Sequence, residues 1–220
     1  MNSPRRITTL ILDLDDTLYK PETGIWNMIG VRISKFMETH LPELNPQEMK
    51  ALRERLLKQY GTTLRGLHLE KNIDVHAYLE EVHDFDLSKL LKPDPELRKA
   101  LALCPQKKFI FTNASRKHAE NVLSCMGLAD LFAGITDVLD VYPYCKPMPE
   151  AFQIMMRRLG ITDTQECLYA DDNLANLETA QALGFLPLYV GHKKGHRFAA
   201  ISEISALMNL PELGCGQASL

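Results

Sequence analysis

Three acidic residues follow a short apolar segment near the start of the chain. Residues 10–12 are Leu, Ile and Leu, and Asp13, Asp15 and Asp16 come after them. Such an apolar run is typical of a strand buried in a parallel sheet, because both faces must be covered. Ligands of open α/β sheets bind beyond the carboxyl ends of the strands, where Asp13 and Asp15 would lie on the same side of the chain. Two carboxylates so close need a cation or a shared proton, unless the segment is an acidic loop in solvent.

Three further segments carry polar side chains where a predicted strand ends or a helix is about to begin. They are Phe109–Asn113, Tyr144–Pro147 and Cys167–Asn173. The chemical groups in them belong to Thr112, Asn113, Lys146, Asp171 and Asp172. The order acid pair, hydroxyl, lysine, acid pair resembles the four motifs of the haloacid dehalogenase-like (HAD) hydrolase superfamily. The dominant chemistry of that superfamily is phosphoryl transfer through an aspartyl phosphate.

The resemblance implies a role for each motif in a phosphatase reaction. Asp13 would be the nucleophile, and Asp15 would protonate the leaving oxygen and later deprotonate the attacking water. The acid–base role of Asp15 requires that acidic neighbours and burial raise its pKa. Thr112 and Asn113 would bind the phosphate, and Lys146 would neutralise its charge.

The same resemblance implies Mg²⁺, a hard cation that takes oxygen ligands. The expected ligands are Asp13, the backbone carbonyl of Asp15, and Asp172, with Asp171 behind them and outside the ligand set. The residue types alone leave open which acid of the pair formed by Asp171 and Asp172 binds the ion directly. Haloacid dehalogenases work without this ion and lack the second aspartate of the first motif. Asp15 therefore favours a phosphatase.

Between the first two predicted strands the apolar spacing is helical. Residues 25–37 and 49–60 carry apolar side chains three and four positions apart, and Trp26 is expected to belong to the core. Gly66 predicts that residues 62–69 form a loop. We therefore expect a block of helices inserted after the first strand.

In the rest of the chain, predicted helices and strands alternate. This alternation predicts a Rossmann-like, doubly wound parallel α/β sheet. Its last predicted strand is Leu186–Val190, and Pro187 confines that strand to an edge, or lies in its first residues. The expected domains are an HAD-like core of residues 1–18 and 92–220 and an inserted helical cap of residues 19–91. Superfamily members of subfamily I carry such a cap, which can close over the site and exclude water.

Composition excludes several classes of partner. The chain has 220 residues with a net charge of −3, so it offers no basic field for nucleic acid. No apolar stretch approaches the ~20 residues that span a bilayer. Five cysteines occur without a C-x-x-C pair and are expected to be reduced thiols. We expect a cytoplasmic protein that acts on a small phosphomonoester.

The substrate is predicted from a narrower resemblance. Four segments are similar to the pyrimidine 5′-nucleotidase group: Asp15–Tyr19, Tyr60–Leu67, Leu91–Asp94 and Tyr169–Asn176. This resemblance implies UMP, CMP or dUMP as substrate, with Tyr60 and Arg65 near the base or ribose. An ordinary turn with Arg65 in solvent is the alternative. A departure from other subfamily I phosphatases is Asn176, where an acid is common, and it would alter the orientation of Lys146. The alternative functions are a phosphatase for a phosphosugar or phosphoglycolate, and a non-catalytic nucleotide-binding protein.

Overall fold

The computed structural model describes residues 6–215. Within them, six parallel strands form one sheet in the order β3-β2-β1-β4-β5-β6. The strands are β1 (Thr9–Leu12), β2 (Lys107–Phe111), β3 (Gly134–Thr136), β4 (Cys167–Asp171), β5 (Leu186–Val190) and β6 (Ala199–Ile201). Because β1 pairs with both β2 and β4, the carboxyl ends of the strands before three of the motifs meet at one edge.

The helices fall into two groups along the chain. Between β1 and β2 the chain forms α1 (Ile25–His40), α2 (Pro46–Tyr60), α3 (Thr63–Lys71), α4 (Val75–Val82) and α5 (Pro95–Leu103). After β2 come α6 (Arg116–Met126), α7 (Val138–Val141), α8 (Pro149–Leu159) and α9 (Leu174–Ala182). Short 3₁₀ helices cover Pro21–Thr23, Leu87–Lys89, Ala129–Leu131, Thr164–Glu166, Ile204–Asn209 and Pro211–Leu213. Across residues 6–215, every helix is too short or too polar to cross a bilayer.

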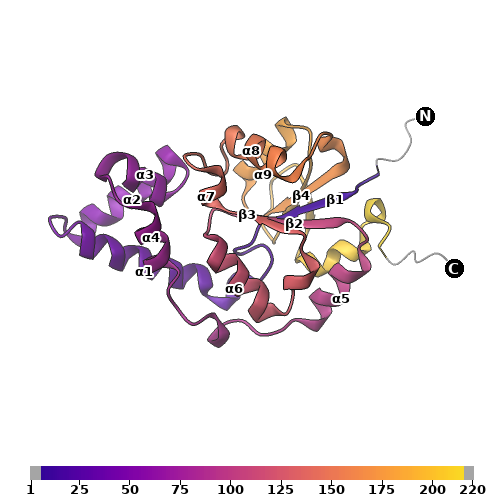
Figure 1. Ribbon diagram of the computed structural model, residues 1–220, viewed down its shortest axis with the longest axis horizontal. Helices are drawn as coiled ribbons and strands as arrows, with labels where there is room; N and C mark the ends of the chain where they lie inside the picture. The colour runs from indigo at the N-terminus through magenta and orange to yellow at the C-terminus, as the bar shows by residue number, and fades with distance from the viewer. Residues whose placement is uncertain (1–5, 216–220) are drawn as a thin grey trace.

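Helices cover both faces of the sheet, which confirms the predicted doubly wound α/β fold. Leu10 and Leu12 of β1 belong to one apolar cluster with side chains of α5 and α6, whereas Ile11 belongs to a second cluster with α8 and α9. These two helix pairs lie on opposite sides of the sheet (Figure 1). The alternation follows from the strand geometry, since successive side chains point to opposite faces.

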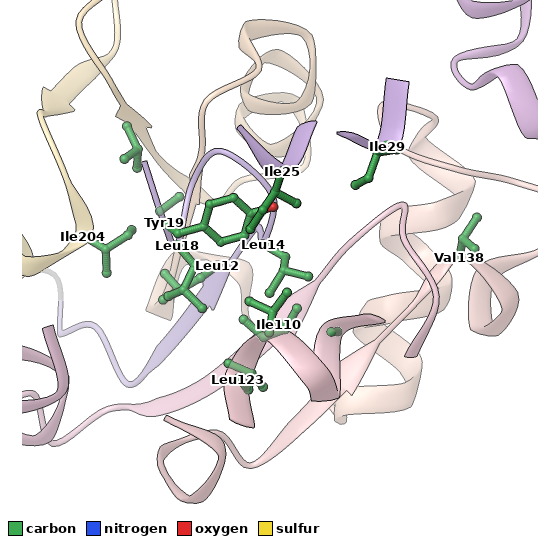
Figure 2. Packing of buried hydrophobic residues seen from close by; sticks show 14 of the residues in the cluster. Leu12, Leu14, Leu18, Tyr19, Ile25, Ile29, Ile110, Leu123, Val138 and Ile204 are labelled. Carbon is green, nitrogen blue, oxygen red and sulfur yellow. The ribbon is translucent and has the colours of Figure 1, made fainter. Parts of the chain in front are cut away.

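The first cluster continues from the sheet into the inserted helices. Figure 1 shows α1–α4 grouped at one end of the molecule. Figure 2 shows Leu12 and Ile110 of the sheet near Leu18 and Tyr19 of the loop after β1, with Ile25 of α1 beside them. The loop that carries the first acidic motif is therefore fixed by apolar packing on both of its sides.

The prediction of a loop at residues 62–69 is wrong, because α3 occupies most of this segment. Thr62 caps the helix by accepting the amide of Arg65 at 3.1 Å. A Cβ atom on Gly66 would lie 2.7 Å from Leu56 and 2.9 Å from Tyr60, both on α2. The glycine therefore permits close packing of two helices instead of ending one.

Two further expectations need correction. Leu186–Val190 forms β5 as predicted, but it is not the last strand, because β6 follows it and pairs with it from Leu188 onward. Pro187 lies in the first residues of β5, which is one of the two predicted positions. Cys104 and Cys215 form a disulfide across 111 positions, so the prediction of reduced thiols is wrong for this pair. The chain after β6 returns to α5, and Gln106 Nε2 donates to the carbonyl of Leu213 at 2.7 Å. This long-range contact leaves no local spacing signal.

Candidate active site

A tight turn after β1 brings the hydroxyl of Thr17 back onto Asp13. The amide of Leu18 donates to the carbonyl of Leu14 at 2.9 Å, and Asp16 adopts the left-handed conformation with φ 57°. Aspartate tolerates that conformation better than most side chains do. The Thr17 hydroxyl donates to Asp13 Oδ2 at 3.1 Å, so the turn fixes one oxygen of the predicted nucleophile.

Lys146 fixes the other oxygen of Asp13. Its side chain is 2% exposed, and Nζ donates to Asp13 Oδ1 at 2.5 Å. The same Nζ donates to Asp171 Oδ2 at 3.1 Å and to the carbonyl of Phe111 at 2.9 Å. The amide group of Asn113 holds the lysine backbone, since its oxygen accepts the Lys146 N–H at 2.9 Å and its nitrogen donates to the carbonyl at 3.0 Å. Asn113 thus positions the lysine, and both ends of its amide are engaged in doing so.

Asp171 is completely buried, and protein donors engage both of its oxygens. Lys146, Tyr169 and Asn176 donate to Oδ2 at 3.1, 2.5 and 2.9 Å. The amide of Asn173 donates to Oδ1 at 2.8 Å. Asn176 therefore influences Lys146 through an acceptor that the two residues share. Such an environment suits an acid that lies behind the expected metal ligands and holds Lys146 in position beside them.

Asp172 is the more exposed acid of the pair. The Thr17 hydroxyl lies 3.3 Å from Asp172 Oδ1 and accepts the Asp172 amide N–H at 3.1 Å, so Thr17 joins the first and fourth motifs. Carboxylate oxygens of Asp13, Asp171 and Asp172 lie within 4.8 Å of one another. The donors that surround Asp171 favour Asp172 as the acid that faces an ion, together with Asp13.

The charges of this cluster fit a divalent cation. Burial raises the pKa of Asp13 well above its usual range, and the Lys146 charge offsets this only in part. Burial and the neighbouring Asp171 raise the pKa of Asp172 to about 6. One lysine thus faces three buried or half-buried carboxylates, and oxygen ligands of this kind are those that Mg²⁺ takes. The residues present are therefore compatible with the predicted ion.

Asp15 has an environment that the sequence did not predict. Tyr19 donates its hydroxyl to Asp15 Oδ1 at 2.5 Å, and His118 Nε2 lies 2.8 Å from the same oxygen. Burial raises the pKa of Asp15, but the charge of His118 and the bonds from His118 and Tyr19 outweigh it and lower the pKa. The expected upward shift is therefore wrong for this arrangement. Tyr19, four positions after Asp15, could have been noticed, whereas His118 gave no signal.

A cavity of about 350 Å³ lies between the core motifs and the inserted helices. From the core, its lining includes Asp13, Asp15, Lys146 and Asp172. From the inserted helices and the segments that join them, it includes Trp26, Ile29, Leu57, Tyr78 and His83. A larger hollow of about 1020 Å³ adjoins Asp16 and Asp172, but neither Asp13 nor Lys146 lines it. The smaller cavity is therefore the candidate substrate site.

Thr112 does not line this cavity. It is 1% exposed, and its hydroxyl accepts the amide of Ala114 at 3.0 Å. Asn113 and Ala114 line the cavity in its place. The hydroxyl of Thr112 thus shapes the loop whose next two residues face the site.

The cap residues differ most from expectation. Tyr60 donates to Glu70 at 2.9 Å, Arg65 Nε donates to the carbonyl of Pro143 at 2.8 Å, and neither side chain lines the cavity. The structure places both residues beside the segment that carries Lys146, since the Tyr60 carbonyl accepts from Cys145 Sγ at 3.3 Å, but it does not bring their side chains to the cavity. Trp26 does line the cavity and is 52% exposed, so the expectation that it is a core residue is wrong. Trp26 lies in the first turn of α1, and its side chain contributes to the cavity wall.

The fold and the acidic cluster are those of a HAD-like hydrolase, and a family comparison agrees. Residues 7–184 match the family of haloacid dehalogenase-like hydrolases, and the chain belongs to this family. It is 31% identical over 186 residues to "Phosphate metabolism protein 8" of Saccharomyces cerevisiae, a match that covers 78% of this chain and 58% of the yeast protein. The chain thus spans little more than half the length of that relative.

Solved structures share the fold at lower identity. L-2-haloacid dehalogenase from Xanthobacter autotrophicus is 16% identical with a TM-score of 0.61, over 96% of this chain and 100% of that chain. The magnesium-bound HAD-hydrolase YfnB from Bacillus subtilis is 18% identical with a TM-score of 0.63, over 93% and 98%. A HAD phosphatase from Thermococcus onnurineus is 18% identical with a TM-score of 0.62, over 92% and 97%. The likeness extends over nearly the whole length of all three.

Proposed function

We propose that this protein is a Mg²⁺-dependent phosphatase that hydrolyses small phosphomonoesters through an aspartyl phosphate on Asp13. One observation carries the proposal: Asp13 and Asp15 line one cavity, together with Lys146 and Asp172. A nucleophile, an acid–base group, a cation and a further acid thus surround the space where a phosphoryl group would react. The side chain of Asp15 favours a phosphatase over a dehalogenase, which does not need a proton donor of this kind.

Each residue has a distinct task in this reaction. Asp13 attacks phosphorus, and Lys146 offsets the negative charge that gathers on the nucleophile and the phosphoryl oxygens. Asp15 gives a proton to the leaving oxygen and then takes one from the water that hydrolyses the aspartyl phosphate. His118 and Tyr19 lower the pKa of Asp15 in the unliganded site, and the negative charge of a bound phosphoryl group would raise that pKa before proton donation. Asp13, Asp172 and the backbone carbonyl of Asp15 would hold Mg²⁺, which when bound neutralises phosphoryl charge. Thr17 keeps Asp13 and Asp172 together.

The proposed substrates are pyrimidine nucleoside 5′-monophosphates. The cavity volume of about 350 Å³ lies within the range of small-molecule sites. Trp26 and Leu57 offer apolar surface from the inserted helices, and we propose that residues 19–91 act as a cap over the site. An aromatic ring suits a planar base, since bases stack on such side chains. The yeast relative, named for phosphate metabolism, is consistent with this chemistry.

The test is phosphate release from a panel of monophosphates. The panel contains UMP, CMP, dUMP, AMP, a phosphosugar, phosphoglycolate and an aryl phosphate, each with Mg²⁺ and with a chelator. We expect Mg²⁺-dependent release, greatest with the pyrimidine nucleotides, and none from Asp13→Asn, which is nearly isosteric but cannot attack phosphorus. A preference for the phosphosugar or phosphoglycolate would reject the nucleotide proposal alone. Activity of Asp13→Asn near that of the wild type would reject the mechanism, and nucleotide binding without any release would leave only a binding protein.

A further inference from the structure

Two donors converge on one oxygen of Asp15. Tyr19 and His118 both bond Oδ1, at 2.5 and 2.8 Å, and neither of these bonds uses Oδ2. The Asp15 side chain is 11% exposed and lines the cavity. A carboxylate with one oxygen held from two directions has little freedom to rotate. Its second oxygen then keeps a constant direction in which to exchange a proton.

His118 reaches Asp15 from the first turns of α6, and its side chain is fully buried. A carboxylate oxygen can only accept, so Nε2 of His118 is the donor in this bond. Nδ1 is buried and has no hydrogen-bond partner among residues 6–215. A histidine kept only to stabilise the fold would be expected to use both ring nitrogens. The bond to Asp15 is thus the contact that accounts for a histidine at this position.

The His118 ring is itself held in place by the inserted helices. His83, which directly follows α4, stacks on it with ring centroids 4.5 Å apart and an angle of 24°. His83 Nδ1 lies 3.2 Å from the hydroxyl of Ser115, which caps α6 and accepts the His118 amide. His83 also lines the cavity. Contacts from the core and from the helical block therefore define the orientation of the His118 ring.

We propose that His118 and Tyr19 are positioning residues that hold Oδ1 of Asp15, so that Oδ2 keeps a fixed direction in which to carry a proton and pass it to the leaving oxygen. The proposal rests on the proposed phosphatase function. It adds two residues that bond the Asp15 side chain and, among the described residues, form no hydrogen bond to Asp13 or Asp172. Proton transfer from a positioned side chain accelerates a reaction about 10²–10⁴-fold, and imprecise orientation forfeits part of this factor.

The dependence on the leaving group tests this role. An aryl phosphate whose leaving phenol is acidic can phosphorylate Asp13 with little help from a proton donor. An alkyl phosphate such as a nucleotide has a poorer leaving group and depends fully on the proton donor. We expect His118→Leu to lower kcat/KM for alkyl phosphates by about 10–100-fold and for the aryl phosphate by clearly less. Tyr19→Phe should act in the same direction while it keeps the packed ring. His118→Gln, which retains a donor near the position of Nε2, should recover part of the loss.

Two comparisons keep the test decisive. In an Asp15→Asn background, His118→Leu should add no leaving-group effect, since the group it positions is gone. His68→Leu, which removes a histidine bonded to the carbonyl of Ile73, should leave the aryl-to-alkyl ratio unchanged. Equal losses on both substrate classes, or additive losses with Asp15→Asn, would overturn the positioning role. A wild-type protein that releases no phosphate would reject the proposed function instead.

Discussion

Removal of the Lys146 charge should destabilise the protein in a way that depends on pH and on Mg²⁺. Lys146→Met keeps most of the side-chain volume but leaves Asp13 and Asp171 without their shared cation. Loss of one partner from a buried ion pair costs about 3–5 kcal/mol, a large fraction of an ordinary folding free energy. We expect a loss in this range at pH 7.5.

The loss should shrink as the pH falls. Burial and neighbouring carboxylates raise the pKa of Asp13, and burial raises that of Asp172 to about 6. A carboxyl whose pKa is higher in the folded state than in the unfolded state binds protons preferentially when folded. It therefore favours the folded state below its unfolded pKa, near 4, and loses this contribution as the pH rises through about 6. Without the lysine these shifts should be larger, so the difference from wild type should narrow between pH 7.5 and pH 5.

Urea unfolding at the two pH values, with and without Mg²⁺, measures the effect. Mg²⁺ at 100 times its dissociation constant should return about 2.7 kcal/mol to any variant that still binds it. Lys108→Met is the matched control, because Lys108 is also buried but donates to the carbonyls of Cys104 and Gln106. Its loss should be smaller and insensitive to Mg²⁺. A Lys146→Met loss that is below about 1 kcal/mol, or that equals the Lys108→Met loss under all conditions, would refute this account of the cluster.

Five further substitutions probe the site and the helical block. Asp172→Asn should abolish Mg²⁺ binding in calorimetry and change the stability measured in chelator only slightly. Asp171→Asn should lower the stability, because it disturbs the donors bonded to Asp171. The reverse pattern would exchange the two roles. Gly66→Ala should destabilise the fold by about 1–3 kcal/mol in urea unfolding, because its Cβ would lie 2.7 Å from Leu56, and an unchanged midpoint would contradict the packing argument. Trp26→Ala should lower the ratio of kcat/KM for UMP to that for an aryl phosphate, by a factor equivalent to about 1–3 kcal/mol. Arg65→Ala should leave that ratio nearly constant. A larger effect at Arg65 would restore the original prediction for the cap.

Local patterns predicted the parts of the structure that local physics determines. The strand before Asp13 and the strand before Asp171 were predicted because a run that is apolar on both faces must be buried on both. Their meeting at one edge followed from the parallel alternation of helices and strands. The roles of Asp171 and Asp172 were implied by the family resemblance and not by the residue types alone, and the donors around Asp171 are compatible with them.

The features that escaped prediction depend on contacts between distant segments. Gly66 resembles a helix breaker until Leu56 is known to pack against it. The helical spacing that includes Trp26 does not tell which part of the apolar face is covered and which faces a cavity. His118 lies 103 positions from Asp15, so only the fold brings the two together. Sequence thus predicted which groups are present, while their hydrogen-bond partners required the structure.

The central claim is that Asp13 carries the phosphoryl group during turnover. In Asp15→Asn the aryl phosphate can still phosphorylate Asp13, but the group that activates water is lost, so the intermediate should accumulate. Quenching this variant during reaction with Mg²⁺, reducing the acyl phosphate with borohydride and locating the product by mass spectrometry identifies the phosphorylated residue. We predict homoserine at position 13, dependent on substrate and absent when Asp13 is also replaced by Asn. Phosphate release without modification at position 13, or modification at another acid, would contradict the account.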